Sequence, residues 1–151
     1  MKLPADLDPD LAARFEYSQA NGLVPRMGIE ILEVSAEYSA ARMPVEGNTQ
    51  TIGILHGGAH VVLGETLGSL SSAIHGGPHR FPVGIEINAT HSRSIERGWV
   101  LGTCTALVLG RTLCTHEIVM TDEEGQRLST VRITNLLRDI DRLPTLASPT
   151  S

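Results

Sequence analysis

Short runs rich in apolar and β-branched residues, separated by segments of Gly, Pro, Asn and Asp, recur along the chain and are typical of β-strands. They predict six strands, over Met27–Val34, Tyr38–Val45, Phe81–Arg93, Trp99–Leu109, Thr112–Thr121 and Arg127–Leu137. The acidic segment Asp122–Gly125 between the last two has the composition of a hairpin turn. Strands joined by short turns favour antiparallel pairing.

Two segments have the pattern of helices. In the first, Asp8 is a suitable N-cap, Pro9 occupies the first helical position, and residues 10–19 continue toward Gly22. In the second, Gly57–Ile74, apolar residues surround most of the helix, which indicates burial. Its glycines lower helix propensity by about 1 kcal/mol each, so close packing should compensate. One long buried helix between runs of strands predicts an α+β fold, with an antiparallel sheet wrapped around the helix.

The length of 151 residues corresponds to a single domain. We divide the chain into an N-terminal helical segment over residues 1–21, the sheet-and-helix domain over 22–140, and a polar tail over 141–151 that we expect to be disordered. The N-terminus lacks the apolar core of a signal peptide, and no apolar run approaches the roughly 18 residues of a membrane span. These features predict a cytoplasmic protein with no membrane partner.

The net charge is −5, and aromatic residues make up 3% of the chain. Nucleic-acid-binding proteins need basic surface and, for single strands, aromatic platforms, so we do not expect nucleic acid as a partner. Arginines clustered between Arg80 and Arg111 still allow a ligand with a few phosphates. Cys104 and Cys114 lie outside any CxxC or Cys/His framework, which indicates reduced, partly buried thiols.

Candidate chemistry lies at Glu65, a carboxylate midway along the helix that otherwise has a buried pattern. Burying a carboxylate costs free energy unless the group is paired or used in function. At the start of the same helix, Gly57 and Gly58 would let a ligand approach the unpaired N–H groups of the first turn, at the positive end of the helix dipole. An oxyanion that forms from a carbonyl group suits such a position.

Gly57 and Glu65 are eight residues apart, which corresponds to about 12 Å along a helix. A carboxylate at that distance cannot attack a carbonyl group bound at the N-terminus of its own helix. If both residues serve one reaction, Glu65 must come from a second subunit whose helix runs antiparallel to the first. A two-fold dimer would supply two such sites.

Two sequence blocks resemble those of a known family. His56-Gly-Gly-Ala followed by Glu65, and then Gly84-Ile-Glu-Ile-Asn-Ala-Thr-His91-Ser-Arg-Ser94, resemble the hotdog-fold thioesterases of the PaaI-like superfamily. The resemblance covers residues 22–138 and is greatest to the group acting on aromatic acyl-thioesters. This group includes the 1,4-dihydroxy-2-naphthoyl-coenzyme A, the enterobactin-pathway proofreading and the Arthrobacter-type 4-hydroxybenzoyl-coenzyme A thioesterases. The resemblance implies a hotdog fold and hydrolysis of an acyl-coenzyme A (acyl-CoA) with an aromatic or medium-size acyl group.

The resemblance also implies roles for individual residues. Gly57 would offer its N–H to the thioester oxygen, while Gln50 and His56 would orient or polarise the thioester. Glu65, from the facing subunit, would act as nucleophile or as general base toward a water molecule that Ser69 positions. The substrate path would be lined by Gly84, His91, Ser92, Arg93, Ser94, Val108, Leu109, Gly110, Arg111, Thr112 and Leu113.

In that path, Arg93 and Arg111 are the expected phosphate partners, because guanidinium groups suit phosphate geometry. The family further implies that dimers pair into a homotetramer. We expect no cofactor, since coenzyme A is part of the substrate.

Other interpretations of these residues stay open. Glu65 could be a structural carboxylate paired with His or Arg. His56 and His60 have the spacing of zinc ligands on a helix, but no third ligand is evident, so we expect no metal and assign His60 no role. His75 and His79 flank a Gly-Gly-Pro turn and are expected to be solvated loop residues. The scaffold could instead hydrate or dehydrate acyl-thioesters, which crotonyl-CoA would test, or bind acyl-CoA without turnover.

Overall fold

The computed structural model describes residues 1–142, so most of the tail predicted over 141–151 lies outside the described residues. Its elements are, in order, α1 (Pro9–Ala20), α2 (Leu23–Arg26), β1 (Glu30–Val34), β2 (Tyr38–Pro44), α3 (Gly57–Gly76), β3 (Arg80–His91), β4 (Trp99–Leu109), β5 (Leu113–Thr121), β6 (Arg127–Asp139) and a 3₁₀ turn (Ile140–Arg142). The six predicted strands and both predicted helices are confirmed.

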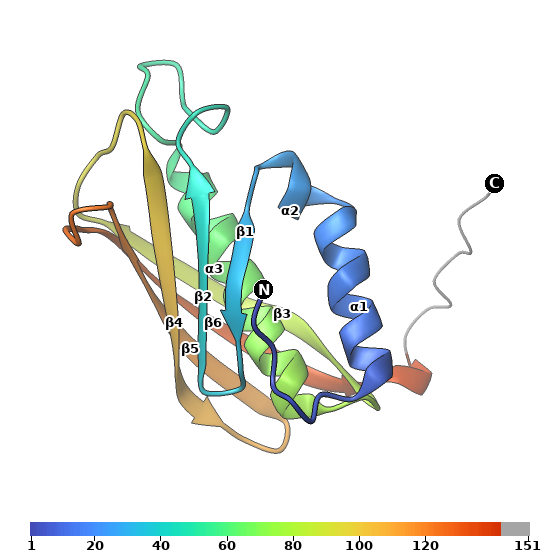
Figure 1. Ribbon diagram of the computed structural model, residues 1–151. Helices are drawn as coiled ribbons and strands as arrows, with labels where there is room; N and C mark the ends of the chain where they lie inside the picture. The colour runs from blue at the N-terminus through green and yellow to red at the C-terminus, as the bar shows by residue number, and fades with distance from the viewer. Residues whose placement is uncertain (143–151) are drawn as a thin grey trace.

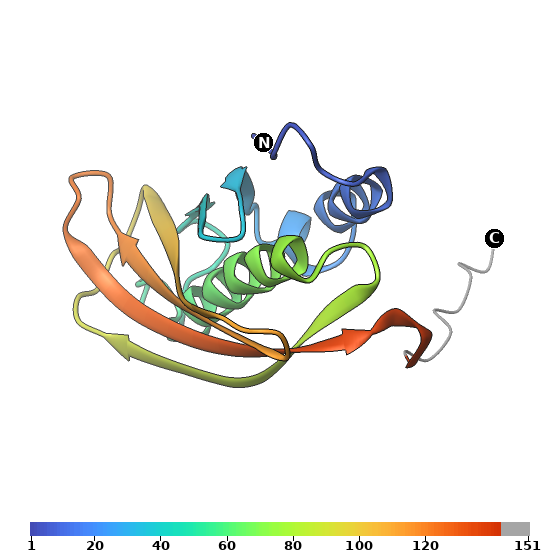
Figure 2. The ribbon, with the colours of Figure 1, turned by 90° about the horizontal axis from the view of Figure 1, so that it is seen from below.

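The strands form one antiparallel sheet in the order β1-β2-β4-β5-β6-β3. Figures 1 and 2 show this sheet curving around one side of α3, with α1 and α2 beside the helix on the other side. The predicted α+β arrangement is therefore confirmed. The two sheet edges differ. The N-terminal segment pairs with β1 through Lys2, whereas no strand among residues 1–142 pairs with the second edge of β3.

Two glycines on α3 allow the helix to lie very close to the sheet. A Cβ atom at Gly64 would lie 2.7 Å from Val131 Cγ1, and one at Gly68 would lie 2.3 Å from Ile133 Cγ2. Both contacts are shorter than van der Waals packing allows, so only glycine fits there. The loss of helix propensity at these positions is thus offset by close helix–sheet packing, as the sequence predicts.

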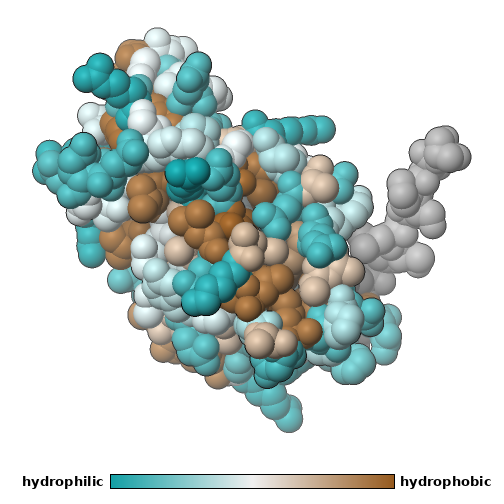
Figure 3. All heavy atoms as spheres, in the orientation of Figure 1, coloured by the Kyte–Doolittle hydropathy of each residue, from teal (hydrophilic) through white to brown (hydrophobic). Residues whose placement is uncertain are grey.

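The core is continuous from the N-terminal helix to the sheet. Leu11 and Phe15 of α1 belong to the same buried cluster as Leu63 and Leu67 of α3 and Val131 of β6. Figure 3 shows that apolar side chains also remain visible along the middle of the face that carries α1 and β1. Although α3 is mostly apolar, none of the helices within residues 1–142 has the length and hydropathy needed to cross a membrane.

The structure differs from the predicted element boundaries at several places. The strand predicted from Met27 begins only at Glu30, because residues 23–26 form the short helix α2 and Gly28 adopts a positive φ of 66°. Helix α3 extends past Ile74 and ends at a cap formed by Gly77, whose N–H donates to the Ala73 and Ile74 carbonyl oxygens. Strand β3 stops at His91, which leaves residues 92–98 as a loop.

The two cysteines lie on the inner face of neighbouring strands β4 and β5. Both Cys104 and Cys114 are free thiols, as predicted, but they are fully buried rather than partly buried. Burial raises the pKa of the Cys104 thiol to about 12, so this group stays protonated and acts as a small apolar side chain.

Candidate active site

The N-terminus of α3 presents a free backbone donor. His56 is the N-cap, and its Nδ1 accepts a hydrogen bond from the Gly58 N–H at 2.9 Å. The Ala59 N–H donates to the His56 carbonyl oxygen at 2.9 Å. Within residues 1–142 no backbone oxygen accepts from the Gly57 N–H. Of the first three N–H groups of the helix, that of Gly57 is therefore the one available to a ligand.

A pocket of about 320 Å³ opens beside this donor. Six of the residues predicted to act on substrate line it, namely Gln50, Gly57, His91, Ser92, Arg93 and Ser94. The apolar residues Ile54, Leu55 and Ile95 form much of the remaining wall. The fold thus brings the loop before α3, the first turn of α3 and the loop after β3 together around one cavity.

His91 lies directly against the first turn of α3. A Cβ atom at Gly57 would lie 2.8 Å from His91 Nε2, so only glycine leaves room for the ring at this position. His91 Nδ1 lies 3.0 Å from Ser129 Oγ, and that hydroxyl donates its one proton to the Thr90 carbonyl oxygen at 3.2 Å. Ser129 must then accept from His91 Nδ1–H, which leaves Nε2 of the neutral ring as an acceptor. Ser129 was not among the predicted site residues.

His60 is a further residue of the pocket that the sequence did not assign. It lies one turn after Gly57 on the same helix face, is 3% exposed, and its ring centroid lies 5.3 Å from that of His91. Burial, with a smaller contribution from His91, lowers the pKa of His60 to about 4, so the ring is neutral near pH 7. The three-residue spacing from Gly57 could have indicated a shared face, but not the contact with a strand 31 residues further on.

Glu65 lies in a different environment from the one predicted. The sequence places it in a buried helix, but in the single chain its side chain is exposed. The reason is that this face of α3 lies over β3, the edge strand, where no further strand covers it. A Cβ atom at Gly84 would lie 3.4 Å from Glu65 Oε1, so the carboxylate lies in van der Waals range of this position on β3.

Ser69 and a buried asparagine extend the group around Glu65. Ser69 Oγ donates to Asn135 Oδ1 at 3.4 Å, and Asn135 Nδ2 donates to Ser72 Oγ at 3.2 Å. Asn135 is fully buried and pairs with Gly84 across β6 and β3. The sequence analysis missed this residue. Its signal was a polar side chain on the inward face of a strand whose neighbouring inward positions are apolar.

The predicted substrate residues Val108–Leu113 lie far from the pocket within one chain. Val108 and Leu109 end β4, Leu113 begins β5, and residues 110–112 form the turn between them, at the C-terminal end of α3. His75 Nε2 lies 3.0 Å from the Gly110 carbonyl oxygen, and Arg80 donates to the Arg111 carbonyl oxygen. The sequence suggested that His75 is a solvated loop residue, and this prediction was wrong. It belongs to the last turn of α3 and holds this turn in place.

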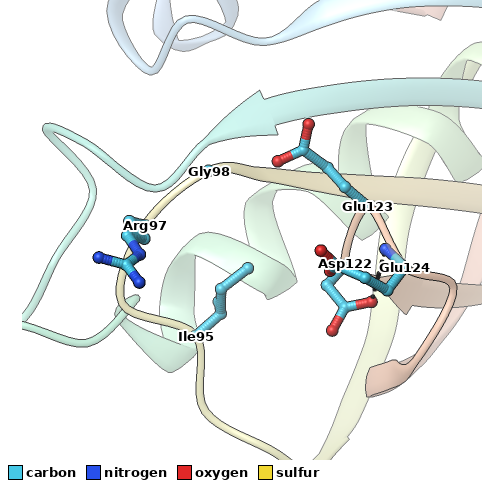
Figure 4. Close-up of a pocket in the computed structure, with 6 residues that line it drawn as sticks. All are labelled: Ile95, Arg97, Gly98, Asp122, Glu123 and Glu124. Carbon is cyan, nitrogen blue, oxygen red and sulfur yellow. Dashed lines mark hydrogen bonds between the residues drawn. The ribbon is translucent and has the colours of Figure 1, made fainter.

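A second hollow lies on the other side of the loop 92–98 (Figure 4). The Ile95 side chain extends into it, between Arg97 and the β5–β6 turn that carries Asp122, Glu123 and Glu124. Three acidic side chains against one arginine make this hollow unsuitable for phosphates. The charge distribution therefore favours the pocket at Gly57, with Arg93 at its wall, for an anionic ligand.

No group of three His, Cys, Asp or Glu side chains is arranged to hold a metal ion in the part of the chain that the structure describes.

Comparisons with known proteins agree with this arrangement. Residues 52–129, half of the chain, match the Thioesterase superfamily. The proofreading thioesterase EntH of Klebsiella pneumoniae is 41% identical over 122 residues, which span 80% of this chain and 89% of that protein.

Among solved structures, thioesterase HI1161 of Haemophilus influenzae superposes with a TM-score of 0.79 at 32% identity, covering 85% of this chain and 90% of that one. A glutamine-to-alanine mutant of thioesterase PA1618 of Pseudomonas aeruginosa gives the same TM-score and identity, with coverages of 89% and 98%.

The chain belongs to the Thioesterase superfamily and has its hotdog fold. The enzyme class is thioester hydrolase, so the resemblance found in the two sequence blocks is confirmed.

Proposed function

We propose that the protein hydrolyses cytoplasmic acyl-CoA thioesters with aromatic or medium-size acyl groups to the free acid and CoA. Glu65 of one subunit would act on a thioester bound at Gly57 of the other. One observation carries the proposal: Glu65 is exposed on α3, eight residues and about 12 Å from the free Gly57 N–H. The 41% identity to a proofreading thioesterase supports thioester hydrolysis, and the aromatic class of substrate follows the resemblance of the two sequence blocks.

The open edge of β3 supports a dimer that would bring these residues together. All twelve residues of β3 are exposed or only partly buried, and Phe81 and Ile85 expose large apolar side chains. A long, uncovered edge strand is a template for pairing with another chain. Antiparallel pairing of β3 with a second copy about a two-fold axis would extend the sheet and place the two α3 helices antiparallel. Pairing of such dimers would give the homotetramer.

In this arrangement each group has one chemical task. The Gly57 N–H donates to the thioester oxygen, where negative charge develops as the carbonyl carbon is attacked. The Glu65 carboxylate either attacks this carbon, forming an anhydride that water then opens, or takes a proton from a water molecule that attacks instead. Ser69, one turn further along α3, holds that water. The C–S bond breaks, and the sulfur leaves as the CoA thiolate, which then takes up a proton.

The charged end of the substrate would lie between the two arginines. Arg93 lines the pocket at Gly57, and Arg111 lies on the β4–β5 turn at the opposite end of α3. With antiparallel helices, the turn of one subunit approaches the pocket of the other. Both guanidinium groups would then reach the phosphates of a single CoA molecule.

Thiol release from a panel of acyl-CoA esters, including benzoyl-CoA, 1,4-dihydroxy-2-naphthoyl-CoA and hexanoyl-CoA, tests the proposal. Glu65→Ala should lower kcat by about two to four orders of magnitude. Glu16→Ala, which removes an exposed carboxylate from helix α1, is the matched control and should leave the rate unchanged. Equal rates for wild type and Glu65→Ala would contradict the catalytic assignment. Oxygen-18 entering Glu65 in a single turnover would indicate the anhydride route.

Subunit mixing tests the shared site. Gly57→Pro removes the N–H and also directs a Cβ atom at His91, so it disables the binding half of the site, while proline remains favoured at the first helical position. Inactive Glu65→Ala and Gly57→Pro chains, mixed by co-expression, would form mixed dimers with one intact site. Random pairing should restore about a quarter of the wild-type sites. No recovery in dimers shown by mass spectrometry to be mixed would contradict a site shared between subunits.

A further inference from the structure

His60 is a buried polar side chain that the proposed reaction does not use. It is 3% exposed, and neither ring nitrogen has a hydrogen-bond partner among residues 1–142. Nδ1 is enclosed by protein, whereas Nε2 is not. Buried polar groups are almost always hydrogen-bonded, and leaving one unpaired costs about 1–3 kcal/mol. An apolar residue of similar size would avoid that cost, so the imidazole needs a reason to be there.

The two histidines of the pocket present opposite hydrogen-bonding groups. His91 is held by Ser129 with its proton on Nδ1, so its Nε2 is an acceptor. The enclosed Nδ1 of His60 has no acceptor nearby, so the proton of the neutral ring belongs on Nε2, where water or a ligand can accept it. The two histidines thus add one donor and one acceptor to a wall that also carries Ile54, Leu55 and Ile95 and the polar residues Gln50, Ser92, Arg93 and Ser94.

A ligand that spans from Gly57 to Arg93 places its linking segment against these histidines. In a CoA ester the segment between thioester and phosphates is the pantetheine arm, which carries two secondary amides. His60 lies three residues, or about 4.5 Å along the axis, from Gly57. This offset relates the two backbone positions, and both residues line the same pocket, so an amide two carbons from the thioester sulfur lies within reach of the His60 ring.

We propose that His60 donates a hydrogen bond from Nε2 to the carbonyl oxygen of the first pantetheine amide and so determines specificity for the thiol half of the substrate. The inference rests on the proposed function, because it places the thioester carbonyl at Gly57. It makes His60 a substrate-binding residue that recognises the arm shared by CoA and phosphopantetheine, independently of the acyl group.

Three benzoyl thioesters separate the possible contacts: benzoyl-CoA, with two amides; S-benzoyl-N-acetylcysteamine, with the first amide only; and S-benzoyl-2-mercaptoethanol, with none. His60→Met removes the donor while keeping an apolar side chain of similar size, and His60→Gln restores an N–H donor. His79→Met replaces an exposed histidine outside the pocket and is the matched control. Thermal unfolding of each variant checks that the fold is kept.

For His60→Met we expect KM to rise about 3- to 10-fold on both amide-containing substrates, with kcat nearly unchanged, because the amide is bound equally in ground and transition states. The mercaptoethanol ester should be hydrolysed at the wild-type rate. His60→Gln should recover most of the loss.

Equal losses on all three esters would show a structural role and overturn the proposal, as would no loss or a loss on benzoyl-CoA alone. Failure of the proposed function is distinct from these results, because the wild-type enzyme would then hydrolyse no acyl-CoA at all.

Discussion

The first turn of α3 and the middle of the same helix differ in how much of their surroundings a single chain supplies. At the first turn, Gly57, His60 and His91 face one another around a pocket, and Ser129 holds His91 in a defined tautomer. Two turns further along, Glu65 is exposed at the open edge of β3. Folding of one chain therefore assembles the pocket, whereas the proposed function requires a partner subunit before Glu65 can act. Under that proposal, folding and catalytic competence are separate events.

The largest expected effect comes from a substitution on the open edge of β3 that disrupts the proposed dimer interface and leaves the first turn of α3 unchanged. Ile85 is 56% exposed on β3, and Ile85→Glu places a charge in the proposed interface. An unpaired charge buried there costs about 3–5 kcal/mol, so we expect monomers and a loss of kcat/KM of about two orders of magnitude. The first turn should stay intact, with His91 still protonated on Nδ1. Analytical ultracentrifugation, kinetics and imidazole ¹⁵N shifts measure the three quantities.

Tyr17→Glu is the control for this prediction, because Tyr17 is 66% exposed on α1, away from β3. It should remain oligomeric and active. A monomeric Ile85→Glu variant with wild-type activity would show that one chain suffices, and the contrast between the two regions of α3 would disappear.

A smaller effect is expected from a methyl group between the helix and the sheet. Gly68→Ala directs a Cβ atom to 2.3 Å from Ile133 Cγ2, so we expect the free energy of unfolding to fall by about 1–3 kcal/mol. Since Ser69 and Glu65 lie beside this contact, kcat should fall more than KM rises. Urea unfolding and steady-state kinetics check both.

The double variant Gly68→Ala/Ile133→Ala removes the clashing Cγ2 atom. The double variant should therefore lose less free energy of unfolding than the sum of the losses in the two single variants. Strict additivity would mean that the helix does not pack against Ile133 as closely as the structure indicates.

The last effect, similar in size to that of Gly68→Ala, concerns pH and His60 near the start of α3. The pKa of His60 is lowered from 6.5 to about 4 in the folded chain. Between pH 4 and pH 6.5 the unfolded chain binds a proton at His60 that the folded chain does not. The contribution of His60 to the free energy of unfolding is therefore most favourable above pH 6.5 and decreases as the pH falls toward 4. His60→Met should flatten this decrease. Urea midpoints at about pH 7.5 and about pH 4.5 measure it, and an equal decrease in both proteins would contradict burial of a neutral His60.

Much of the fold could be predicted because its signals are local. Turn residues separate the strands, and the capping signals of Asp8 and Pro9 place α1 within one residue. The short helix α2 was missed because four residues, one of them Pro25, carry no periodic pattern. The glycines of α3 indicated close packing, although the partners on β6 could not be named.

The candidate site was harder to predict because its contacts cross long stretches of chain. Gln50, Gly57 and the block His91–Ser94 were named and lie around one pocket. The role of His60 depends on the register that brings His91 to it, which no local pattern specifies. The prediction that Glu65 is buried was wrong. A helix that is apolar on most sides does not indicate which of its faces lies over an edge strand.

The two glycines that face β6 have a consequence for the direction of Glu65 and Ser69, the proposed catalytic side chains. Successive residues of an α-helix are rotated by about 100°, and Glu65 and Ser69 each follow one of these glycines. Holding Gly64 and Gly68 against the sheet therefore sets the azimuth of the carboxylate and of the hydroxyl toward β3. A bulkier residue at either glycine would turn the helix about its axis and re-aim Glu65 while leaving residue 65 itself untouched. The orientation of the Glu65 carboxylate is encoded at positions that have no side chain.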